Sequence, residues 1–353
     1  MTFLKPPSPR LLFGILGTLL FGAAGGWLFV QLTMPLPWLI GALVLSTVAA
    51  LMGAPLKGPG TLRNVMIGVL GIMLGSSFTP EALANAGDWV LSLSTLVLFV
   101  ITVVGMVSLY LTKVGGYDPV SAYFSASPGG LATMVSMGMS MGGDERLIGL
   151  THSVRIMLTV LIIPFWFRFF AGYVPGDVPD IGSIGSVSGM DLLILGSCAL
   201  GYPLAKVLRF PAPSMMGPLL LSAAVHMAGF TAAKPPTEIV NLAQVVIGTG
   251  IGCRFVGIPV RHVINTLVTS AGATLFMLGL AAAAAMGLEQ ATGLPFRALW
   301  LSFSPGGLAE MTLISLSMGI DTAFVSTHHL LRVLFMVLAA PLVFSVLRKR
   351  FSI

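Results

Sequence analysis

Charged residues are scarce in this chain. Its 353 residues include 18 Lys and Arg and 12 Asp and Glu, which together make 8% of the sequence, whereas about a quarter of an average soluble domain is charged. Hydrophobic residues make up 56%. This number of polar groups is too small to cover the surface of a water-soluble protein. The composition therefore indicates a membrane protein.

Cysteine is nearly missing as well. Cys198 and Cys253 lie in apolar or glycine-rich runs, which argues against a disulfide framework or a cysteine-based metal site. The histidines show no metal-ligand spacing with carboxylates, and no nucleophile–base pair is evident, so we expect no metal, no cofactor and no enzymatic activity. No basic patch is interleaved with aromatic residues, so we expect no direct binding of nucleic acid.

Long apolar stretches are what the chain does contain. They are continuous runs of Leu, Val, Ala, Met and Gly, and a membrane-spanning helix needs about 20 such residues. We predict an all-α polytopic membrane protein embedded in a lipid bilayer. The predicted helices cover about 11–32, 37–53, 63–79, 88–112, 118–140, 148–170, 191–208, 213–230, 238–255, 262–287, 295–318 and 324–347.

The two halves of the chain repeat each other. The motif Ser-Pro-Gly-Gly-Leu-Ala occupies 127–132 and returns at 304–309, a shift of 177 residues. From 127 to 164 the alignment with the second half needs no gap, and 16 of the 38 positions are identical. Identities at Pro, His, Arg and Asp do not arise from shared hydrophobicity. We therefore predict two homologous repeats of five or six transmembrane helices each.

The repeats predict the domain organisation. We place the first transmembrane repeat at 11–172, a polar linker at 173–190 and the second repeat at 191–348. Six spans per repeat would make the repeats parallel, and five would make them inverted. With six spans and a cytoplasmic N-terminus, positive charges cluster inside in the first half but do not decide the second. Both arrangements stay open, as does the oligomeric state, a homo-oligomer included.

Each repeat contains one helix that its own sequence breaks. A proline removes a backbone donor and two glycines lower helix propensity, so Ser-Pro-Gly-Gly frees backbone groups in mid-span. Matched breaks in two halves point to a binding site at the membrane midplane, and a packing kink between close helices is the alternative. The candidate substrate-binding residues are Ser127, Pro128, Gly129, Gly130, Ser304, Pro305, Gly306, Gly307 and Glu310.

A His-x-x-Arg pair follows each break. His152 and Arg155, like His329 and Arg332, are three residues apart and share one helix face. An arginine at mid-helix costs about 2.5–3.5 kcal/mol on insertion scales, so it must face the interior of the bundle. Two roles stay open, namely charge balance or gating, and anchoring of the carbonyl groups that the break frees.

Glu310 departs from the repeat, because its counterpart in the first half is Thr133. A carboxylate one turn after a break, between apolar neighbours, is either desolvated or paired with a cation such as Arg332. We expect it to couple transport to protons or cations, and a stabilising charge at a helix N-terminus is the alternative. Asp144 and Asp321 are expected to cap the helices that follow them.

These motifs resemble a known family. The duplicated Ser-Pro-Gly-Gly-Leu-Ala-x-Met with its trailing His-x-x-Arg is similar, over essentially the full chain, to the bacterial membrane AbrB-type duplication family. Members of that family carry the labels ammonia monooxygenase and regulator. The resemblance implies an indirect role in regulation of gene expression, while a monooxygenase would need metal ligands that this sequence lacks. The breaks are also similar, more loosely, to those of bile-acid-symporter and cation/proton-antiporter-like transporters.

Our leading hypothesis is a multi-pass protein of the bacterial cell inner membrane with a cytoplasmic N-terminus. It would transport or export a small anionic or amphiphilic solute that binds where the two breaks meet, with coupling to protons or cations. The alternative is a membrane-embedded sensor or scaffold that regulates gene expression through a soluble partner. Neither the solute nor the coupling ion follows from the sequence.

Overall fold

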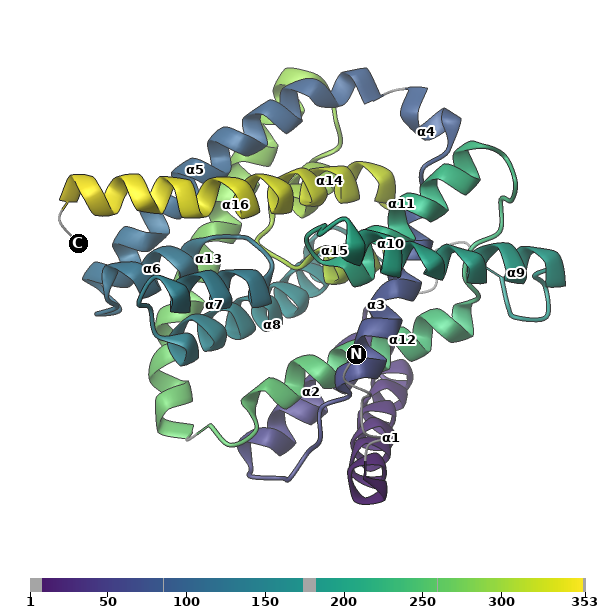
Figure 1. Ribbon diagram of the computed structural model, residues 1–353, viewed down its shortest axis with the longest axis horizontal. Coiled ribbons are helices and arrows are strands. Elements are labelled where there is room, and N and C mark those ends of the chain that lie inside the picture. The colour runs from purple at the N-terminus through teal and green to yellow at the C-terminus, as the bar shows by residue number, and fades with distance from the viewer. Residues whose placement is uncertain (1–7, 85, 174–181, 259, 352–353) are drawn as a thin grey trace.

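The computed structural model describes residues 8–84, 86–173, 182–258 and 260–351. Within these ranges the chain is helical and contains no strand (Figure 1). Part of the linker predicted at 173–190, residues 174–181, lies outside the described residues. The prediction of an all-α protein is confirmed. The described segments long and apolar enough to cross a membrane are Arg10–Gln31, Ala86–Lys113, Glu145–Phe170, Gly189–Val207, Thr266–Thr292 and Thr322–Phe344.

One bundle, which we call the panel, takes helices from both halves. From the first half come α1 (Pro9–Gln31), α2 (Pro37–Leu51) and α3 (Gly60–Gly75). From the second half come α9 (Gly189–Ser197), η2 (Cys198–Leu200), α10 (Gly201–Val207), α11 (Pro213–Met227) and α12 (Thr237–Gly252). Within the panel the closest packing is between α3 and α11, and between α2 and both α1 and α12.

Glycines allow α3 to approach α11, and α2 to approach α12, closely. A methyl group added at Gly71 would lie 2.5 Å from the Met215 carbonyl oxygen, and one added at Gly248 would clash with the Leu39 carbonyl oxygen. Further along, Gly75 faces Ser222 and Gly252 faces Ser46. The order of these contacts shows that α3 runs in the same direction as α11, and α2 in the same direction as α12.

The second bundle, which we call the hairpin bundle, also combines both halves. The short α4 (Pro80–Ala84) and η1 (Ala86–Trp89) lead into it from the panel, and η3 (Cys253–Phe255) links α12 to it. Its helices are α5 (Val90–Lys113), α6 (Pro119–Ala126), α7 (Leu131–Ser140), α8 (Glu145–Phe170), α13 (Val260–Thr292), α14 (Phe296–Phe303), α15 (Leu308–Ser317) and α16 (Thr322–Phe351).

The segment predicted as one helix at 118–140 is instead a helical hairpin, so that prediction was wrong. Helix α6 ends at Ala126, and α7 returns alongside it (Figure 1). A methyl group added at Gly138 would lie 3.3 Å from Phe124 Cβ, and the Asp144 backbone N–H donates to Ser121 Oγ at 2.8 Å. Ser-Pro-Gly-Gly forms the tip, because the proline and glycines let the chain reverse instead of merely bending.

The segment predicted as one helix at 295–318 is likewise divided into α14 and α15, with Ser-Pro-Gly-Gly between them. Both ends of this unit contact the segment that follows α8. Arg297 donates to the Ala171 carbonyl oxygen at 2.8 Å, and the Tyr173 hydroxyl donates to the Ser317 carbonyl oxygen at 2.7 Å. The start of α14 and the end of α15 therefore lie together, and this unit is a second hairpin.

Helix α8 shows how the two hairpins are oriented. Its first residue, Glu145, follows the base of the first hairpin, and the residues just after its last turn contact the base of the second. Its 26 residues span about 39 Å, more than the roughly 30 Å hydrocarbon core of a bilayer. The two hairpins therefore enter the bundle from opposite ends of α8.

Candidate functional site

The first His-x-x-Arg pair holds the first hairpin. His152 Nε2 donates to the Phe124 carbonyl oxygen at 2.9 Å, and Arg155 donates to the Ser125 carbonyl oxygen at 3.1 Å. These carbonyl groups belong to the last turn of α6, where intrahelical donors run out. Arg155 also donates to His152 Nδ1 at 2.7 Å. The contacts match the anchoring role for this pair.

The second pair holds the second hairpin in a similar way. His329 Nε2 donates to the Leu301 carbonyl oxygen at 3.0 Å. Arg332 donates to the carbonyl oxygens of Ser304, at 2.6 Å, and of Gly306. Both arginines are buried, as expected for charges in a membrane bundle. Arg332 differs from Arg155 in that its second terminal nitrogen donates to the Gly306 carbonyl oxygen of the tip and not to its own histidine.

The two tips meet. Pro128 and Pro305 line one small cavity together with Phe303 and Arg332, and its volume of about 10 Å³ holds no more than one water molecule. The guanidinium groups of Arg155 and Arg332 are close enough to interact electrostatically. The predicted meeting of the breaks is therefore present in the fold, but the space between the tips is closed.

The other tip residues support the backbone. Ser127 Oγ donates to the Tyr123 carbonyl oxygen at 2.8 Å, and Ser304 Oγ donates to that of Trp300 at 2.6 Å. A methyl group added at Gly129 would meet the Met134 side chain, and one at Gly306 would meet that of Met311. A bare backbone at these two positions lets each methionine pack under its tip.

Glu310 lies in the first turn of α15 and is 4% exposed. Its carboxylate folds over Gly307, so that a methyl group added there would clash with Oε2. It interacts electrostatically with Arg254, the middle residue of η3, and not with Arg332 as the spacing of the motif suggests. Sequence reasoning missed Arg254, because 56 residues separate it from Glu310 and no motif contains it.

Arg254 has two further neighbours. It interacts electrostatically with Arg63, near the start of α3, and it lies within electrostatic range of the His152 ring of α8. The Arg63 side chain crosses Gly250 of α12, with its Cδ 3.0 Å from where a methyl group would stand. Arg254 thus lies between the anchor of the first hairpin and the first turn of the second.

The predicted caps of the following helices are confirmed. Asp144 Oδ1 accepts hydrogen bonds from the backbone N–H groups of Arg146, at 2.8 Å, and Leu147, at 3.1 Å. Asp321 Oδ1 accepts one from the Phe324 N–H at 3.0 Å. Both carboxylates fix the turn between a hairpin and the long helix after it.

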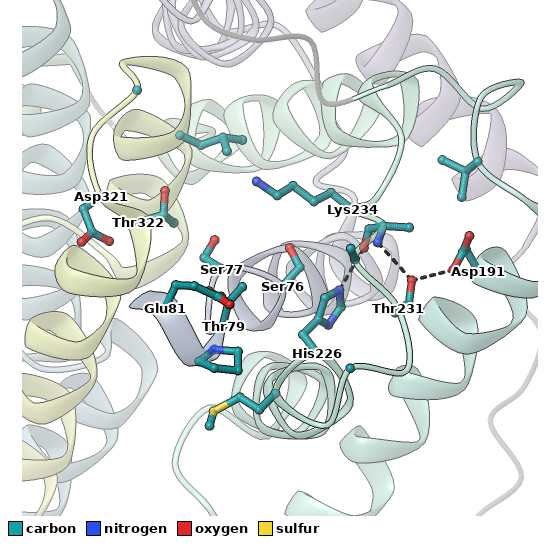
Figure 2. A pocket seen from close by; sticks show the side chains of 18 of the residues that line it. Ser76, Ser77, Thr79, Glu81, Asp191, His226, Thr231, Lys234, Asp321 and Thr322 are labelled. Carbon is teal, nitrogen blue, oxygen red and sulfur yellow. Dashed lines mark hydrogen bonds between the residues drawn. The ribbon is translucent and has the colours of Figure 1, made fainter. Parts of the chain in front are cut away.

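A large polar cavity, which we call the vestibule, opens at the other end of α3 (Figure 2). Its volume is about 930 Å³. Four separate stretches line it, namely 76–81, 186–191, 226–234 and 316–322. Figure 2 shows the Lys234 side chain extending into the space, with Asp321 and Thr322 on one side and Asp191, Thr231 and His226 on the other. No motif in the sequence pointed to it.

Carboxylates outnumber cations around the vestibule. Among the described residues, Glu81, Asp191 and Asp321 line it, and Lys234 is the one lysine that does. A hydrogen bond from its own backbone N–H, with a second from Thr79, lowers the pKa of Glu81, so this carboxylate is ionised at neutral pH. Asp191 accepts hydrogen bonds at 2.6 Å from Ser188 and from Thr231. The cavity therefore carries a net negative charge.

Comparison with known proteins identifies one family and two similar proteins. The family model described as "Transition state regulatory protein AbrB" matches residues 38–348. The "Uncharacterized protein YhjN" of Bacillus subtilis (strain 168) is 26% identical over 355 residues, covering 90% of this chain and 89% of that protein. The "Putative regulator AbrB" of Escherichia coli (strain K12) is 24% identical over 335 residues, covering 94% and 95%.

Proposed function

This chain belongs to the AbrB family, and from that premise and its membrane-length helices we propose that it is a secondary transporter that exports a small solute across the bacterial cell inner membrane. One observation carries the proposal. Pro128 and Pro305, from tips that enter from opposite ends of α8, line one cavity. Broken backbone that meets at mid-depth is the arrangement by which transporters build a solute site.

The proposal includes an inverted topology. A hairpin begins and ends on one side and adds no crossing, so each half crosses five times. The first half uses α1, α2, α3, α5 and α8, and the second uses α9 with α10, α11, α12, α13 and α16. An odd number reverses the second repeat. The parallel packing of α2 with α12 supports this, because the repeat counterpart of α12 is α3, which returns in the opposite direction to α2.

The distribution of positive charge supports a cytoplasmic N-terminus for this topology. Of the 18 Lys and Arg residues, thirteen fall on the cytoplasmic side, three fall outside, and Arg155 and Arg332 lie inside the bundle. The three outside are Arg168, Lys234 and Arg297. The thirteen inside are Lys5, Arg10, Lys57, Arg63, Lys113, Arg146, Lys206, Arg209, Arg254, Arg261, Arg348, Lys349 and Arg350. With five spans in each half, unlike six, the positive charges of the second half also favour a cytoplasmic N-terminus.

The same topology gives the solute a route. Every stretch that lines the vestibule falls on the outer side, whereas Arg63 and Arg254 lie toward the cytoplasm. A basic inner end favours capture of an anion from the cell, and a vestibule with surplus carboxylates favours its release. The closed space between the tips requires the hairpins to part during transport.

Glu310 is the proposed coupling residue, because it is a buried carboxylate beside the solute path. Purified protein in proteoliposomes, screened against small carboxylates, phosphate and sulfate under proton and sodium gradients, tests both ideas. We expect solute flux that follows one gradient. Glu310→Gln should remove the dependence on the gradient, and Thr133→Val, at the counterpart position, should keep it.

The outcomes separate the two claims. Flux no greater than in empty liposomes for every solute would contradict transport. Flux that is independent of all gradients in both the unmodified protein and Glu310→Gln would leave transport standing and remove Glu310 from the coupling role.

A second candidate is a membrane-embedded regulator of gene expression, favoured by the name of the Escherichia coli relative, "Putative regulator AbrB". Such a protein would need a soluble partner. Crosslinking in intact cells followed by detergent purification should then recover one partner reproducibly. A transcript change that disappears when the exported solute is removed from the medium would instead make regulation an indirect effect of transport.

A further inference from the structure

Two half-buried arginines at the inner end of the panel, Arg63 and Arg254, each have one buried guanidinium nitrogen that no described residue satisfies. Nε of Arg63 and one terminal guanidinium nitrogen of Arg254 are fully buried and have no hydrogen-bond partner. The two side chains are close enough to interact electrostatically. Like charges beside each other with unsatisfied buried donors are unfavourable unless something else completes the site. The missing component must accept hydrogen bonds and carry negative charge.

Glu310 completes the site only in part. Its carboxylate interacts electrostatically with Arg254, but within the described residues no hydrogen bond joins it to either arginine. One carboxylate against two guanidinium groups also leaves a surplus of one positive charge. Arg155 and Arg332 cannot take up Glu310 instead, because hairpin carbonyl groups already engage them.

We propose that Arg63 and Arg254 bind a small oxyanion next to the second hairpin, and that Glu310 is an internal carboxylate that competes with this anion for Arg254. Guanidinium groups match the planar, multidentate geometry of carboxylate, phosphate and sulfate. The inference rests on the proposed transport function, and it names the class of solute and the residues that select it. Arg254 lies within electrostatic range of Glu310 in the second hairpin and of His152, which holds the first, so an anion bound there would stabilise one arrangement of the tips.

Two sources supply this chemistry, a free anion and the phosphate headgroup of an anionic lipid, since Arg63 lies near the inner end of α3. The test uses the full-length protein in neutral detergent and measures the concentration dependence of thermal stabilisation by acetate, inorganic phosphate and sulfate. A parallel arm replaces these with phosphatidylglycerol. Stabilisation by free anions assigns the site to the solute, and stabilisation by the lipid alone assigns it to the headgroup.

The variants determine whether these residues form the site. Arg63→Gln and Arg254→Gln should each lose the stabilisation, and Arg146→Gln, an exposed arginine on the same side, should keep it. Glu310→Gln should bind the anion about tenfold more tightly, because a competing charge is removed. Arg254→Lys keeps the charge if the glutamine variant does not fold, and it should weaken the binding.

Stabilisation that persists in Arg63→Gln and Arg254→Gln, or an unchanged affinity in Glu310→Gln, would overturn the proposal. So would the absence of any anion effect in the unmodified protein. Transport is measured separately by flux in proteoliposomes. Normal flux of a cationic or neutral solute in Arg254→Gln would remove the anion site while leaving the transporter intact.

Discussion

The two hairpins share a motif but differ in their surroundings. In α15 every residue from Leu308 to Ser315 is buried, and the helix packs against α3 of the panel. In α7 only Met134 and Gly138 are buried. The second hairpin is therefore docked on the panel, while the first has a largely accessible return helix. For the proposed transporter, these unequal environments would correspond to one end state of alternating access.

The arginines that anchor the two hairpins, Arg155 and Arg332, also differ in their hydrogen bonds. Arg155 donates one hydrogen bond to His152, and its two hydrogen bonds to the Ser127 carbonyl oxygen are both 3.5 Å long. Arg332 reaches the Ser304 carbonyl oxygen at 2.6 Å, and His329 Nδ1 is left buried without a partner. The docked hairpin is thus held more tightly at its tip. Exchange of these two arrangements between the hairpins would produce the opposite end state.

The largest expected effect comes from the anchors. Arg332→Ala leaves two tip carbonyl groups unpaired and should destabilise the protein by roughly 3 kcal/mol, whereas Arg155→Ala should cost roughly 2 kcal/mol. Thermal unfolding in detergent measures both, with Arg146→Ala as the exposed control. Equal losses of stability in Arg332→Ala and Arg155→Ala would contradict the conclusion that the tip of the second hairpin is held more tightly.

The two close helix crossings of the panel, α3 with α11 and α2 with α12, are expected to respond equally to mutation. Gly71→Ala and Gly248→Ala each push a methyl group onto a backbone carbonyl of a helix from the other half. Each should destabilise the protein by about 2 kcal/mol, because backbone cannot move aside as a side chain can. Denaturation of both variants should give losses that agree closely. A large loss at one glycine alone would show that the two crossings are not equivalent.

The tip glycines provide a matched pair with a smaller effect. Gly307→Ala collides with the Glu310 carboxylate, whereas a methyl group at Gly130 lies 3.6 Å from Thr133 Oγ1, an ordinary contact. We expect Gly307→Ala to cost about 1–2 kcal/mol and Gly130→Ala under about 0.5 kcal/mol. Coupled flux should fall in the first variant only. A similar loss in both would place the requirement in the glycine backbone and not in Glu310.

The smallest expected effect comes from side-chain hydrogen bonds that α6 and α14, the first helices of the two hairpins, make to neighbouring helices. The Tyr123 hydroxyl donates to the Ala340 carbonyl oxygen at 3.0 Å, and Trp300 Nε1 donates to that of Leu278 at 3.1 Å. Tyr123→Phe and Trp300→Phe should each cost about 1 kcal/mol in thermal unfolding. A cost well above this at Tyr123 would show that the first hairpin is held more firmly than its exposed return helix suggests.

Much of the fold follows from the sequence. The predicted helix at 213–230 corresponds to Pro213–Met227, and that at 37–53 to Pro37–Leu51, because apolar length and proline starts determine such boundaries locally. The reversal at 127–130 does not follow from sequence. Proline and glycine free the backbone, but whether the chain kinks or turns back depends on the packing of α7 against α6.

The site divides in the same way. The motif correctly pointed to the place where the tips meet, since Pro128 and Pro305 share a cavity. The partner of Glu310 could not be inferred from the sequence. Arg254 comes near Glu310 only because helices from the two halves pack together in the panel. The vestibule could not be inferred either, because four distant stretches form it. Long-range contacts between halves, and not local propensity, create both features.

The most direct test of the account is the side of the membrane on which each hairpin begins and ends. Glu145 and Thr322 are equivalent residues, each the first of the helix that follows a hairpin. Glu145→Cys and Thr322→Cys, each in a background with Cys198→Ala and Cys253→Ala, can be labelled with a membrane-impermeant thiol reagent in vesicles of both orientations. We predict labelling at 145 only from the cytoplasmic side and at 322 only from the outer side. Labelling of both positions from the same side would contradict the opposed hairpins and the transport site built on them.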